Sequence, residues 1–264
     1  MKNCCQSGQV PGADVPDRRG RTGLHRTGLD LVRNPDVVVR EVDLLSADWY
    51  VLRATTFDIR TSDGAWRTER RETYDRGNGA TLLLYDAHRR RVLLTRQFRY
   101  PAYVNGHPDG MLLETAASLL DDDDPEVAIR REAAEETGVM VGEVEHVFDV
   151  YMSPGSVTEK LHFYAAPYLS HALDGGRHGI LEEGEDIQAL ELSIDEAVAA
   201  IGSRIVDAKT IMLIQWAVLS GPFSDTSARS SVVPDDAAPQ ADARRSVPDT
   251  SGAITAGVRR PALP

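Results

Sequence analysis

The chain has 264 residues, of which 42% are hydrophobic, so it is long and apolar enough to bury a core, and its formal net charge is -12. Because nucleic-acid backbones need basic surfaces, this charge argues against a nucleic acid as the main partner, although a nucleotide needs only a local cluster of cations. The two cysteines, Cys4 and Cys5, are adjacent, so we expect no structural disulfide between them. No apolar run reaches the length of a membrane span, and we expect a soluble protein of the cytoplasm.

Composition divides the chain into one domain between two tails. Residues 1–35 are rich in Gly, Arg, Asp and Pro, and residues 222–264 are rich in Ser, Pro, Asp, Ala and Arg. Neither segment shows a hydrophobic period, so we expect both to be disordered. The domain between them, residues 36–221, divides into an N-terminal β-hairpin region (36–75) and a core (76–221).

The first half of the domain is expected to form strands joined by short turns. Residues 37–42 and 49–60 are rich in strand-forming side chains, and a Thr-Ser-Asp-Gly turn at 61–64 closes a hairpin. The returning strand, residues 65–74, is unusually charged, which is typical of a solvated edge strand. Further strands are predicted over residues 79–85, 91–98 and 111–114, with a charged turn at 86–90 and a loop at 101–110.

The second half alternates strands and helices. Strands are predicted over residues 144–152, 161–168 and 187–192, a flexible loop over 170–184, and helices over 194–201 and 207–219. Ser193 and Glu196 have the spacing of a capping box at the start of the first of these helices. The last helix has apolar residues at helical spacing, which predicts that it packs on the core.

Between these halves, residues 125–137 are predicted to form a short helix. Asp124 has the chemistry of an N-cap, Pro125 suits the first helical position, and Gly138 is a typical helix stop. The inner face of this helix is predicted to consist of Val127, Ala128, Ile129 and Ala133.

Three glutamates crowd one face of that helix. Glu132 and Glu136 are one turn apart, and Glu135 lies beside them, so their like charges destabilise the helix unless a cation is present. Arg131 can reach Glu135 at i+4, but it leaves the pair formed by Glu132 and Glu136 without a cation in this segment. A hard divalent ion such as magnesium would suit carboxylate ligands, whereas a solvated acidic face is the alternative interpretation.

The same segment resembles a known motif. The pattern Arg131-Glu132-x-x-Glu135-Glu136-x-Gly138-Val139 is similar to the second half of the Nudix hydrolase box. In the first half, Ser118 and Asp124 stand where the box has glycine and glutamate, and the spacing is one residue shorter, as in the GDP-mannose pyrophosphatase branch of that family. Other stretches that resemble this branch are residues 71–81, 96–99, 104–106 and 151–155, and the resemblance extends from about residue 45 to 215.

The resemblance implies an α/β/α Nudix sandwich with a mixed sheet and an N-terminal β-hairpin, in a homodimer. It implies hydrolysis of the pyrophosphate of a nucleoside diphosphate sugar, with GDP-mannose giving GMP and mannose 1-phosphate. Magnesium is the implied cofactor, with manganese as the alternative ion. Within enzymes the rival substrates are ADP-ribose and other nucleotide sugars, and from a different class the rival is a nucleotide-sugar binding or sensor module that hydrolyses poorly.

Site residues also follow from the resemblance. The implied metal ligands are the carbonyl of Ala117 and the carboxylates of Glu132, Glu136 and Glu185. The implied substrate contacts are Trp49, Arg70, Arg71, Glu72, Arg99, Ala117, Ser118, Glu136, Glu159, Glu185 and Lys209, the first four from a hairpin that crosses to the partner subunit. The implied catalytic residues are Glu159, as the base that orients the attacking water, with Glu135 and Arg131.

Each of these assignments has a plainer structural alternative. The hairpin charges can belong to a solvated edge, Arg96 or Arg99 can pair with an acid structurally, and Lys209 can be a solvated helix terminus. Glu159 can be a solvated loop residue. If the backbone at Ser118 requires a positive φ, the serine costs about 1 kcal/mol or more.

Overall fold

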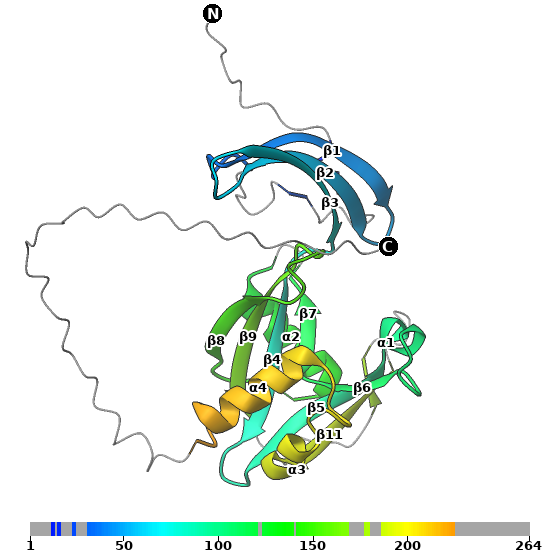
Figure 1. Cartoon of the computed structure of the whole chain (residues 1–264). Coiled ribbons are helices and arrows are strands. Elements are labelled where there is room, and N and C mark those ends of the chain that lie inside the picture. Colours follow the sequence, from blue (N-terminus) through cyan, green and yellow to red (C-terminus); the bar gives the residue numbers. More distant parts are fainter. Residues whose placement is uncertain are drawn as a thin grey trace, which may run out of the picture. The chain divides into compact units, whose positions relative to one another are not determined.

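The computed structural model describes residues 12, 13, 15, 16, 23, 24, 31–120, 123–139, 141–168, 177–179 and 186–224. These residues form a three-stranded N-terminal sheet and an eight-stranded core sheet with helices (Figure 1). The N-terminal sheet consists of β1 (Val37–Ala47), β2 (Val51–Arg60) and β3 (Trp66–Asp75). The core sheet consists of β4 (Gly79–Asp86), β5 (Arg91–Phe98), β6 (Met111–Glu114), β7 (Ala116–Leu119), β8 (Glu145–Tyr151), β9 (Lys160–Pro167), β10 (Arg177–His178) and β11 (Ile187–Ser193). The helices are α1 (Tyr100–Val104), α2 (Pro125–Thr137), α3 (Ile194–Ala199) and α4 (Ala208–Leu219).

The core sheet is mixed. Its strands follow the order β10-β11-β5-β4-β9-β8, with β6 beside β5 and β7 beside β4. β4 and β9 are parallel, and the other neighbours are antiparallel. The parallel pair lies in the centre of the sheet, where both faces are covered, as parallel strands require.

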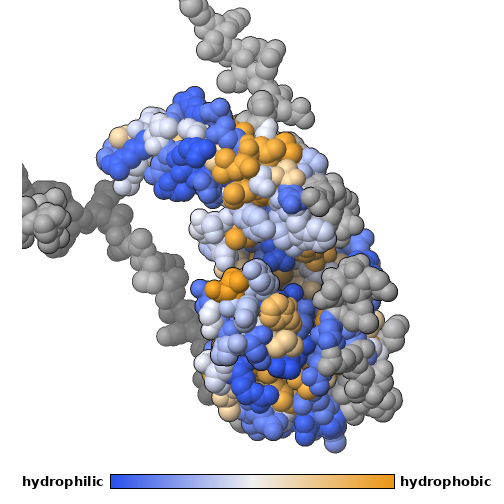
Figure 2. All heavy atoms as spheres, turned by 90° about the vertical axis from the view of Figure 1, so that its right-hand side faces the viewer, coloured by the Kyte–Doolittle hydropathy of each residue, from blue (hydrophilic) through white to orange (hydrophobic). Residues whose placement is uncertain are grey.

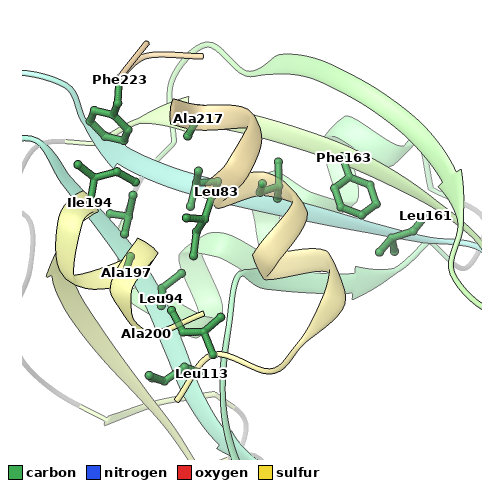
Figure 3. Close-up of a cluster of buried hydrophobic side chains, with 14 residues drawn as sticks. Leu83, Leu94, Leu113, Leu161, Phe163, Ile194, Ala197, Ala200, Ala217 and Phe223 are labelled. Atoms are coloured by element: carbon green, nitrogen blue, oxygen red, sulfur yellow. The ribbon is translucent and has the colours of Figure 1, made fainter. Parts of the chain in front are cut away.

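Alternating side chains of β4 serve two hydrophobic layers. Leu83 faces the layer that α3 and α4 cover, where it packs in one buried cluster with Ala217 (Figure 3). Leu82 and Leu84 face the opposite layer, in a second cluster with Ile129 of α2. Because side chains of a strand point to opposite faces in turn, one apolar strand supports helices on both sides. The predicted α/β/α sandwich is confirmed.

The N-terminal sheet contains the predicted hairpin and one further strand. β2 and β3 are the two strands of the hairpin, and β1 pairs with β2 from Val37 opposite Ile59 to Ala47 opposite Val51. β1 therefore extends beyond the predicted end at residue 42, because its pairing with β2 continues to Ala47, with register shifts after Val39 and Leu44. β3 is an edge strand with mostly exposed side chains, and Figure 2 shows hydrophilic residues over one end of this sheet and an apolar area over its other end.

A buried arginine joins the N-terminal sheet to a segment ahead of it. Arg53 of β2 is fully buried, and its guanidinium contacts Asp75 of β3 at 2.6 Å. It also donates to the carbonyl oxygens of Gly12 at 3.0 Å and Val15 at 2.5 Å. Ala13 between them is fully buried. These described residues of the predicted tail therefore contribute to the packing of the sheet.

Three short elements were not predicted from the sequence. α1 lies in the predicted loop at 101–110, and β10 lies in the predicted loop at 170–184. β7 follows β6 after a break at Thr115 and pairs with β4. All three are too short to show a hydrophobic period, so their conformation depends on neighbours rather than on local pattern.

The longer helices begin and end close to the predicted residues. α3 begins with the expected capping box of Ser193 and Glu196. One side chain of α2 was misassigned, because Val127 is 57% exposed and lies off the buried face. Of the helices that the structure describes, none combines the length and apolarity needed to cross a membrane.

Some predictions fall on residues outside the described ranges. These are Cys4, Cys5, Glu185 and the tail beyond residue 224. At the near end of that tail, Phe223 is buried in the cluster under α3 and α4 (Figure 3). The packed core therefore extends past the predicted boundary at residue 221.

Candidate active site

α2 supports the three glutamates that the sequence singled out, and its ends form as predicted. Asp124 is the N-cap, with a carboxylate oxygen that accepts a hydrogen bond from a first-turn N–H at 3.0 Å. Gly138 is the C-cap, with φ of 70° in the left-handed region that favours glycine. Because the segment between these caps is helical, Glu132 and Glu136 lie one turn apart on the same face.

The three glutamates occupy different environments. Glu136 is 3% exposed, Glu132 is half-buried and Glu135 is exposed. The side-chain amide of Gln97 on β5 donates to Glu136 Oε1 at 3.4 Å. A buried carboxylate beside a second carboxylate is a set of hard oxygen donors, and this is the donor chemistry that a divalent ion such as Mg²⁺ takes. The residues present therefore fit a hard divalent metal ion.

Arg131 has a different partner from the expected one. Its guanidinium pairs with Asp123 at 2.7 Å, in the loop before α2, rather than with Glu135 one turn further on. The hydrogen bond that Arg131 donates to Asp123 raises the pKa of Arg131, and the charges of Asp123, Glu135 and Glu132 add to that effect. The charge of Arg131 thus interacts with the glutamates, but its ion pair is with Asp123.

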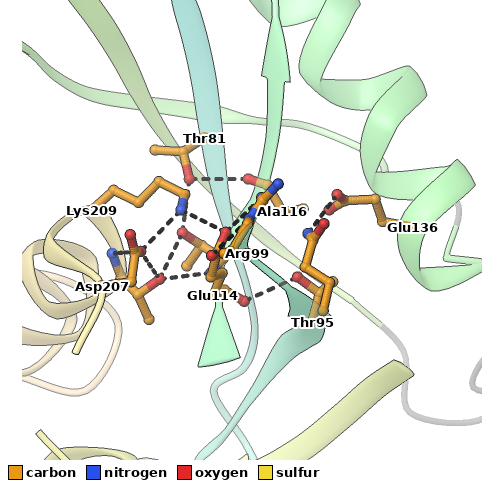
Figure 4. A network of polar contacts seen from close by, with 11 residues as sticks. Thr81, Thr95, Arg99, Glu114, Ala116, Glu136, Asp207 and Lys209 are labelled. Carbon is orange, nitrogen blue, oxygen red and sulfur yellow. Dashed lines mark hydrogen bonds and ion pairs between the residues drawn. The ribbon is translucent and has the colours of Figure 1, made fainter. Parts of the chain in front are cut away.

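A second cluster forms around Glu114, at the end of β6, which sequence analysis did not single out. Arg99, just after β5, donates to both oxygens of this carboxylate at 3.0 and 2.7 Å. Lys209, in the first turn of α4, approaches the same carboxylate at 2.9 Å and Asp207 at 3.0 Å (Figure 4). Two of the predicted substrate contacts therefore converge on one buried acid.

The cluster is electrostatically linked to α2. Burial disfavours the charge of Glu114, but Lys209 and Arg99 outweigh it and lower the pKa of this carboxyl from 4.5 to about 2. Burial also disfavours the charge of Arg99, yet the bonds to Glu114 and the nearby charge of Glu136 raise its pKa. Arg99 thus lies within electrostatic reach of both the Glu114 cluster and the buried glutamate of α2.

The structure contradicts the plainer structural alternative for Lys209 and supports it for Arg96. Lys209 is not a solvated helix terminus, since its side chain is only 12% exposed. Arg96 forms an ordinary surface pair with Asp109 at 3.3 Å. Arg99 does pair with an acid, but 39% of its side chain is exposed, so its guanidinium is held in place and still accessible.

Buried threonines fix the backbone around Glu114 (Figure 4). The backbone N–H of Thr115 donates to Thr210 Oγ1 at 2.8 Å, and Thr81 Oγ1 donates to the carbonyl of Ala116 at 3.0 Å. Thr210 Oγ1 in turn donates to Asp207 at 2.6 Å. These bonds satisfy the polar groups exposed by the break between β6 and β7 and connect α4 to both strands.

Ala117 and Ser118 lie in β7, opposite Thr81 and Ala80 of β4. The concern about a positive φ at Ser118 is wrong, because among the described non-glycine residues only Arg90 has a positive φ. A strand accepts serine without backbone strain, so the glycine of the motif is not needed for this conformation.

Glu159 lies before β9 and is largely buried. Its side chain is 12% exposed and pairs with Arg76 at 3.5 Å, so it is not a solvated loop residue. Glu159 Oε1 and the carbonyl oxygen of Ser118 lie 3.4 and 2.9 Å from the point where Gly79 would place a Cβ. The structure therefore brings Glu159 next to β7.

The four predicted contacts from the hairpin lie on the N-terminal sheet, Trp49 between β1 and β2, and Arg70, Arg71 and Glu72 on β3. All four side chains are exposed. Arg70 pairs with Asp43 at 3.2 Å, and Arg71 pairs with Glu69. Exposed pairs of this kind contribute little to stability, so a ligand can replace them at small cost.

Sequence reasoning missed the residues that hold others in place. Glu114 ends an otherwise apolar strand, and a lone carboxylate in that position is a signal that could have identified it. Gln97 lies in a stretch already noted for resemblance. Thr210 gave no signal, because its role depends on a contact with Thr115 across the fold.

Family models match the described domain almost completely. Residues 36–74 match the model described as "GDP-mannose pyrophosphatase NudK N-terminal domain". Residues 75–213 match the "NUDIX domain" model. The chain belongs to the Nudix family, in its group of GDP-mannose pyrophosphatases.

Curated relatives agree with this assignment. The chain is 52% identical over 185 residues to the GDP-mannose pyrophosphatase of Pectobacterium atrosepticum. The aligned region covers 70% of this chain and 95% of the relative. It is 53% identical over 180 residues to that of Yersinia enterocolitica, covering 68% and 93%. It is 46% identical over 188 residues to that of Klebsiella pneumoniae, covering 71% and 94%.

Proposed function

We propose that the chain hydrolyses GDP-mannose to GMP and mannose 1-phosphate with a bound divalent ion. The names of its relatives support the substrate, and the observation that carries the chemistry is the arrangement of α2 and the Glu114 cluster. Buried Glu136 supplies oxygen ligands, while Arg99 and Lys209 supply positive charge nearby. A diphosphate needs both kinds of group, because its oxygens bind cations and its cleavage develops negative charge.

Glu132 and Glu136 would hold the ion with the carbonyl of Ala117 and the carboxylate of Glu185. Mg²⁺ is our preferred ion and Mn²⁺ the alternative, since both take carboxylate and carbonyl oxygens. When bound, the ion would neutralise phosphate charge and lower the pKa of a coordinated water. Gln97 would orient Glu136 toward that position through its hydrogen bond.

Arg99 and Lys209 would bind the phosphate oxygens. The contacts of both cations with Glu114, and of Lys209 with Asp207, orient them before substrate arrives. The accessible guanidinium of Arg99 would attract the diphosphate. Ordering these long side chains in advance avoids much of the entropy that binding would otherwise cost.

Glu159 would orient the attacking water and accept its proton as the P–O–P bond breaks, with Glu135 and Arg131 in supporting catalytic roles. Its pairing with Arg76 keeps the carboxylate in a fixed position next to β7. A base acts only when it is within hydrogen-bond reach of the water, so this fixed position is what the role requires.

The nucleotide would be bound by the N-terminal sheet of a partner subunit in a homodimer. Trp49 offers an exposed ring for stacking on a base, and Arg70 and Arg71 offer guanidiniums. Glu72 and Ser118 would complete these contacts with hydrogen bonds. The exposed edge of β3 leaves all of these β3 side chains accessible.

The experiment is release of monophosphate from GDP-mannose, ADP-ribose, other nucleotide sugars and NADH, each with Mg²⁺, with Mn²⁺ and with chelator. We expect metal-dependent turnover of GDP-mannose above the rest. Faster turnover of ADP-ribose would replace the proposed substrate and keep the reaction. Binding of GDP-mannose without any turnover would replace the enzyme with the sensor module.

A further inference from the structure

Two histidines and an aspartate meet at the β8 edge of the core sheet, on residues that the proposed reaction does not use. His146 and Asp149 belong to β8, and His162 belongs to β9. His146 Nε2 lies 2.8 Å from Asp149 Oδ1, and His162 Nδ1 lies 2.7 Å from the same oxygen. One carboxylate oxygen thus faces an imidazole nitrogen from each of two strands.

A bulge in β8 is what brings the three side chains together. Asp149 is directly opposite His162 across the two strands, so these two share a face. His146 is three residues before Asp149, and in a regular strand that spacing would place it on the opposite face. The register shift between His146 and Phe148 adds one residue and returns His146 to the face of Asp149.

The cluster has the composition and spacing of a metal site. The possible ligand atoms of His146, Asp149 and His162 all lie within 4.8 Å of one another. Two imidazoles and a carboxylate are a common set of protein ligands for Zn²⁺, whose bonds of about 2.0–2.2 Å place tetrahedral ligands somewhat closer together than this. The His146 side chain is 51% exposed, so its ring can rotate to close that gap.

We propose that His146, Asp149 and His162 bind one borderline transition-metal ion, with Zn²⁺ as the representative of that class, at the β8 edge of the core sheet. The fourth position would face solvent beside the exposed His146 ring. The two imidazoles distinguish this site chemically from the all-oxygen site on α2, since imidazole selects zinc-like ions and carboxylates alone select magnesium-like ions.

Binding of the ion requires the imidazole protons to move to the other ring nitrogen, but it requires no rearrangement of the backbone. Where both imidazoles donate to Asp149, each must use its other tautomer so that the nitrogen facing the carboxylate has a free lone pair. The ion would then displace one hydrogen bond at each ring.

One nearby charge opposes the ion. Lys160 lies 3.5 Å from Asp149 Oδ2, although its side chain is 34% exposed and can move away. The ring of His146 packs edge-on against Tyr164 of β9 at 5.3 Å, which holds it on the same face of the sheet as His162.

The test is Zn²⁺ affinity of the full chain, measured by competition with a chromophoric chelator. Cys4 and Cys5 are replaced by serine so that thiols contribute nothing, and Mg²⁺ is present in excess to occupy the α2 glutamates. We expect one equivalent to bind. His162→Gln and His146→Gln should each lower the affinity by more than the roughly 10- to 100-fold that loss of an outer-shell partner costs.

Three control variants separate the new site from other metal ligands. His88→Gln, an exposed histidine in the turn between β4 and β5, should leave the affinity unchanged. Glu136→Gln should also leave it unchanged, because that residue belongs to the α2 site. Lys160→Gln should increase the affinity, since it removes the opposing charge.

A spectroscopic measurement keeps the inference testable if a variant folds poorly. Addition of Zn²⁺ to the parent should shift the imidazole NMR signals that disappear in His146→Gln and His162→Gln. Equal Zn²⁺ affinity in the parent and both variants, or zinc-induced shifts confined to other histidines, would overturn the proposal.

Discussion

Two buried ionic clusters in this chain have similar composition and different accessibility. In the N-terminal sheet, Arg53 is fully buried, and all three guanidinium nitrogens contact protein oxygens, from Asp75 and two carbonyls. In the core, Arg99 and Lys209 share Glu114, Lys209 also contacts Asp207, and Arg99 is 39% exposed. The first cluster is closed to solvent, whereas the second keeps one guanidinium within reach of a ligand.

The difference shows how a buried ion pair can be assigned to structure or to function. Burial alone does not decide it, because Asp75 and Glu114 are both nearly inaccessible. What decides it is whether a cation of the cluster remains in reach of solvent. Breaking a closed pair such as Arg53 and Asp75 costs stability, whereas removing an accessible cation such as Arg99 costs activity.

Arg53→Met and Arg99→Met compare the two clusters directly. Arg53→Met should lower the free energy of unfolding by about 3 to 5 kcal/mol, because it leaves Asp75 buried without its cation. Arg99→Met should lower it by less, since Lys209 still pairs with Glu114, while turnover of GDP-mannose falls steeply. Urea unfolding and steady-state kinetics of both variants check this. If Arg99→Met destabilises the fold more than Arg53→Met does, the comparison fails.

Glu136→Gln tests the catalytic side of the comparison. We expect kcat to fall by about 10³-fold or more, roughly 4 kcal/mol, because the amide is a poor ligand for a divalent ion. The remaining rate should respond weakly to Mg²⁺. Glu126→Gln, on the same helix but paired with Arg130, is the matched control and should retain activity. Unchanged turnover and Mg²⁺ dependence in Glu136→Gln would disprove the metal assignment.

The lowered pKa of Glu114 predicts how the free energy of unfolding depends on pH. Because the folded state lowers this pKa from 4.5 to about 2, the stabilisation is fully present above pH 4.5 and is lost as pH falls toward 2. Its size is about 3 kcal/mol by the conversion of pKa differences into free energy. Unfolding free energies measured from pH 5 to 2.5 should therefore fall more steeply in the parent than in Glu114→Gln. Parallel curves would contradict the assignment.

Glu159→Gln separates a base from a binding residue. We expect kcat to fall by about 10²-fold, within the range of lost general-base catalysis, while KM changes little. The conservative replacement keeps the size of the side chain next to β7. A raised KM with unchanged kcat would instead make Glu159 a substrate contact.

Deletion of residues 1–35 is the mildest change. Activity should remain intact, because none of the proposed catalytic residues lies there. The free energy of unfolding should fall by about 1 to 2 kcal/mol, since Arg53 loses its bonds to the carbonyls of Gly12 and Val15 and regains water instead. Thermal and urea unfolding check the second expectation, and loss of activity would contradict the first.

Local determinants explain why much of this fold could be predicted. α2 is specified by Asp124, Pro125 and Gly138 within a single segment, and β5 is bounded by a charged turn. Pairing across the chain explains what was missed. Glu114 meets Lys209 across 95 residues, β7 is defined by its register with β4, and the bulge at His146 appears only in the pairing with β9.

One glycine sets the distance between the loop of Glu159 and β7. At Gly79 a side chain would meet Leu161 at 2.8 Å and the carbonyl of Ser118 at 2.9 Å, with Glu159 at 3.4 Å. Because glycine has no Cβ, the carboxylate of Glu159 and the backbone of β7 can approach this position from two sides. Any larger residue at Gly79 would push the proposed base and β7 apart.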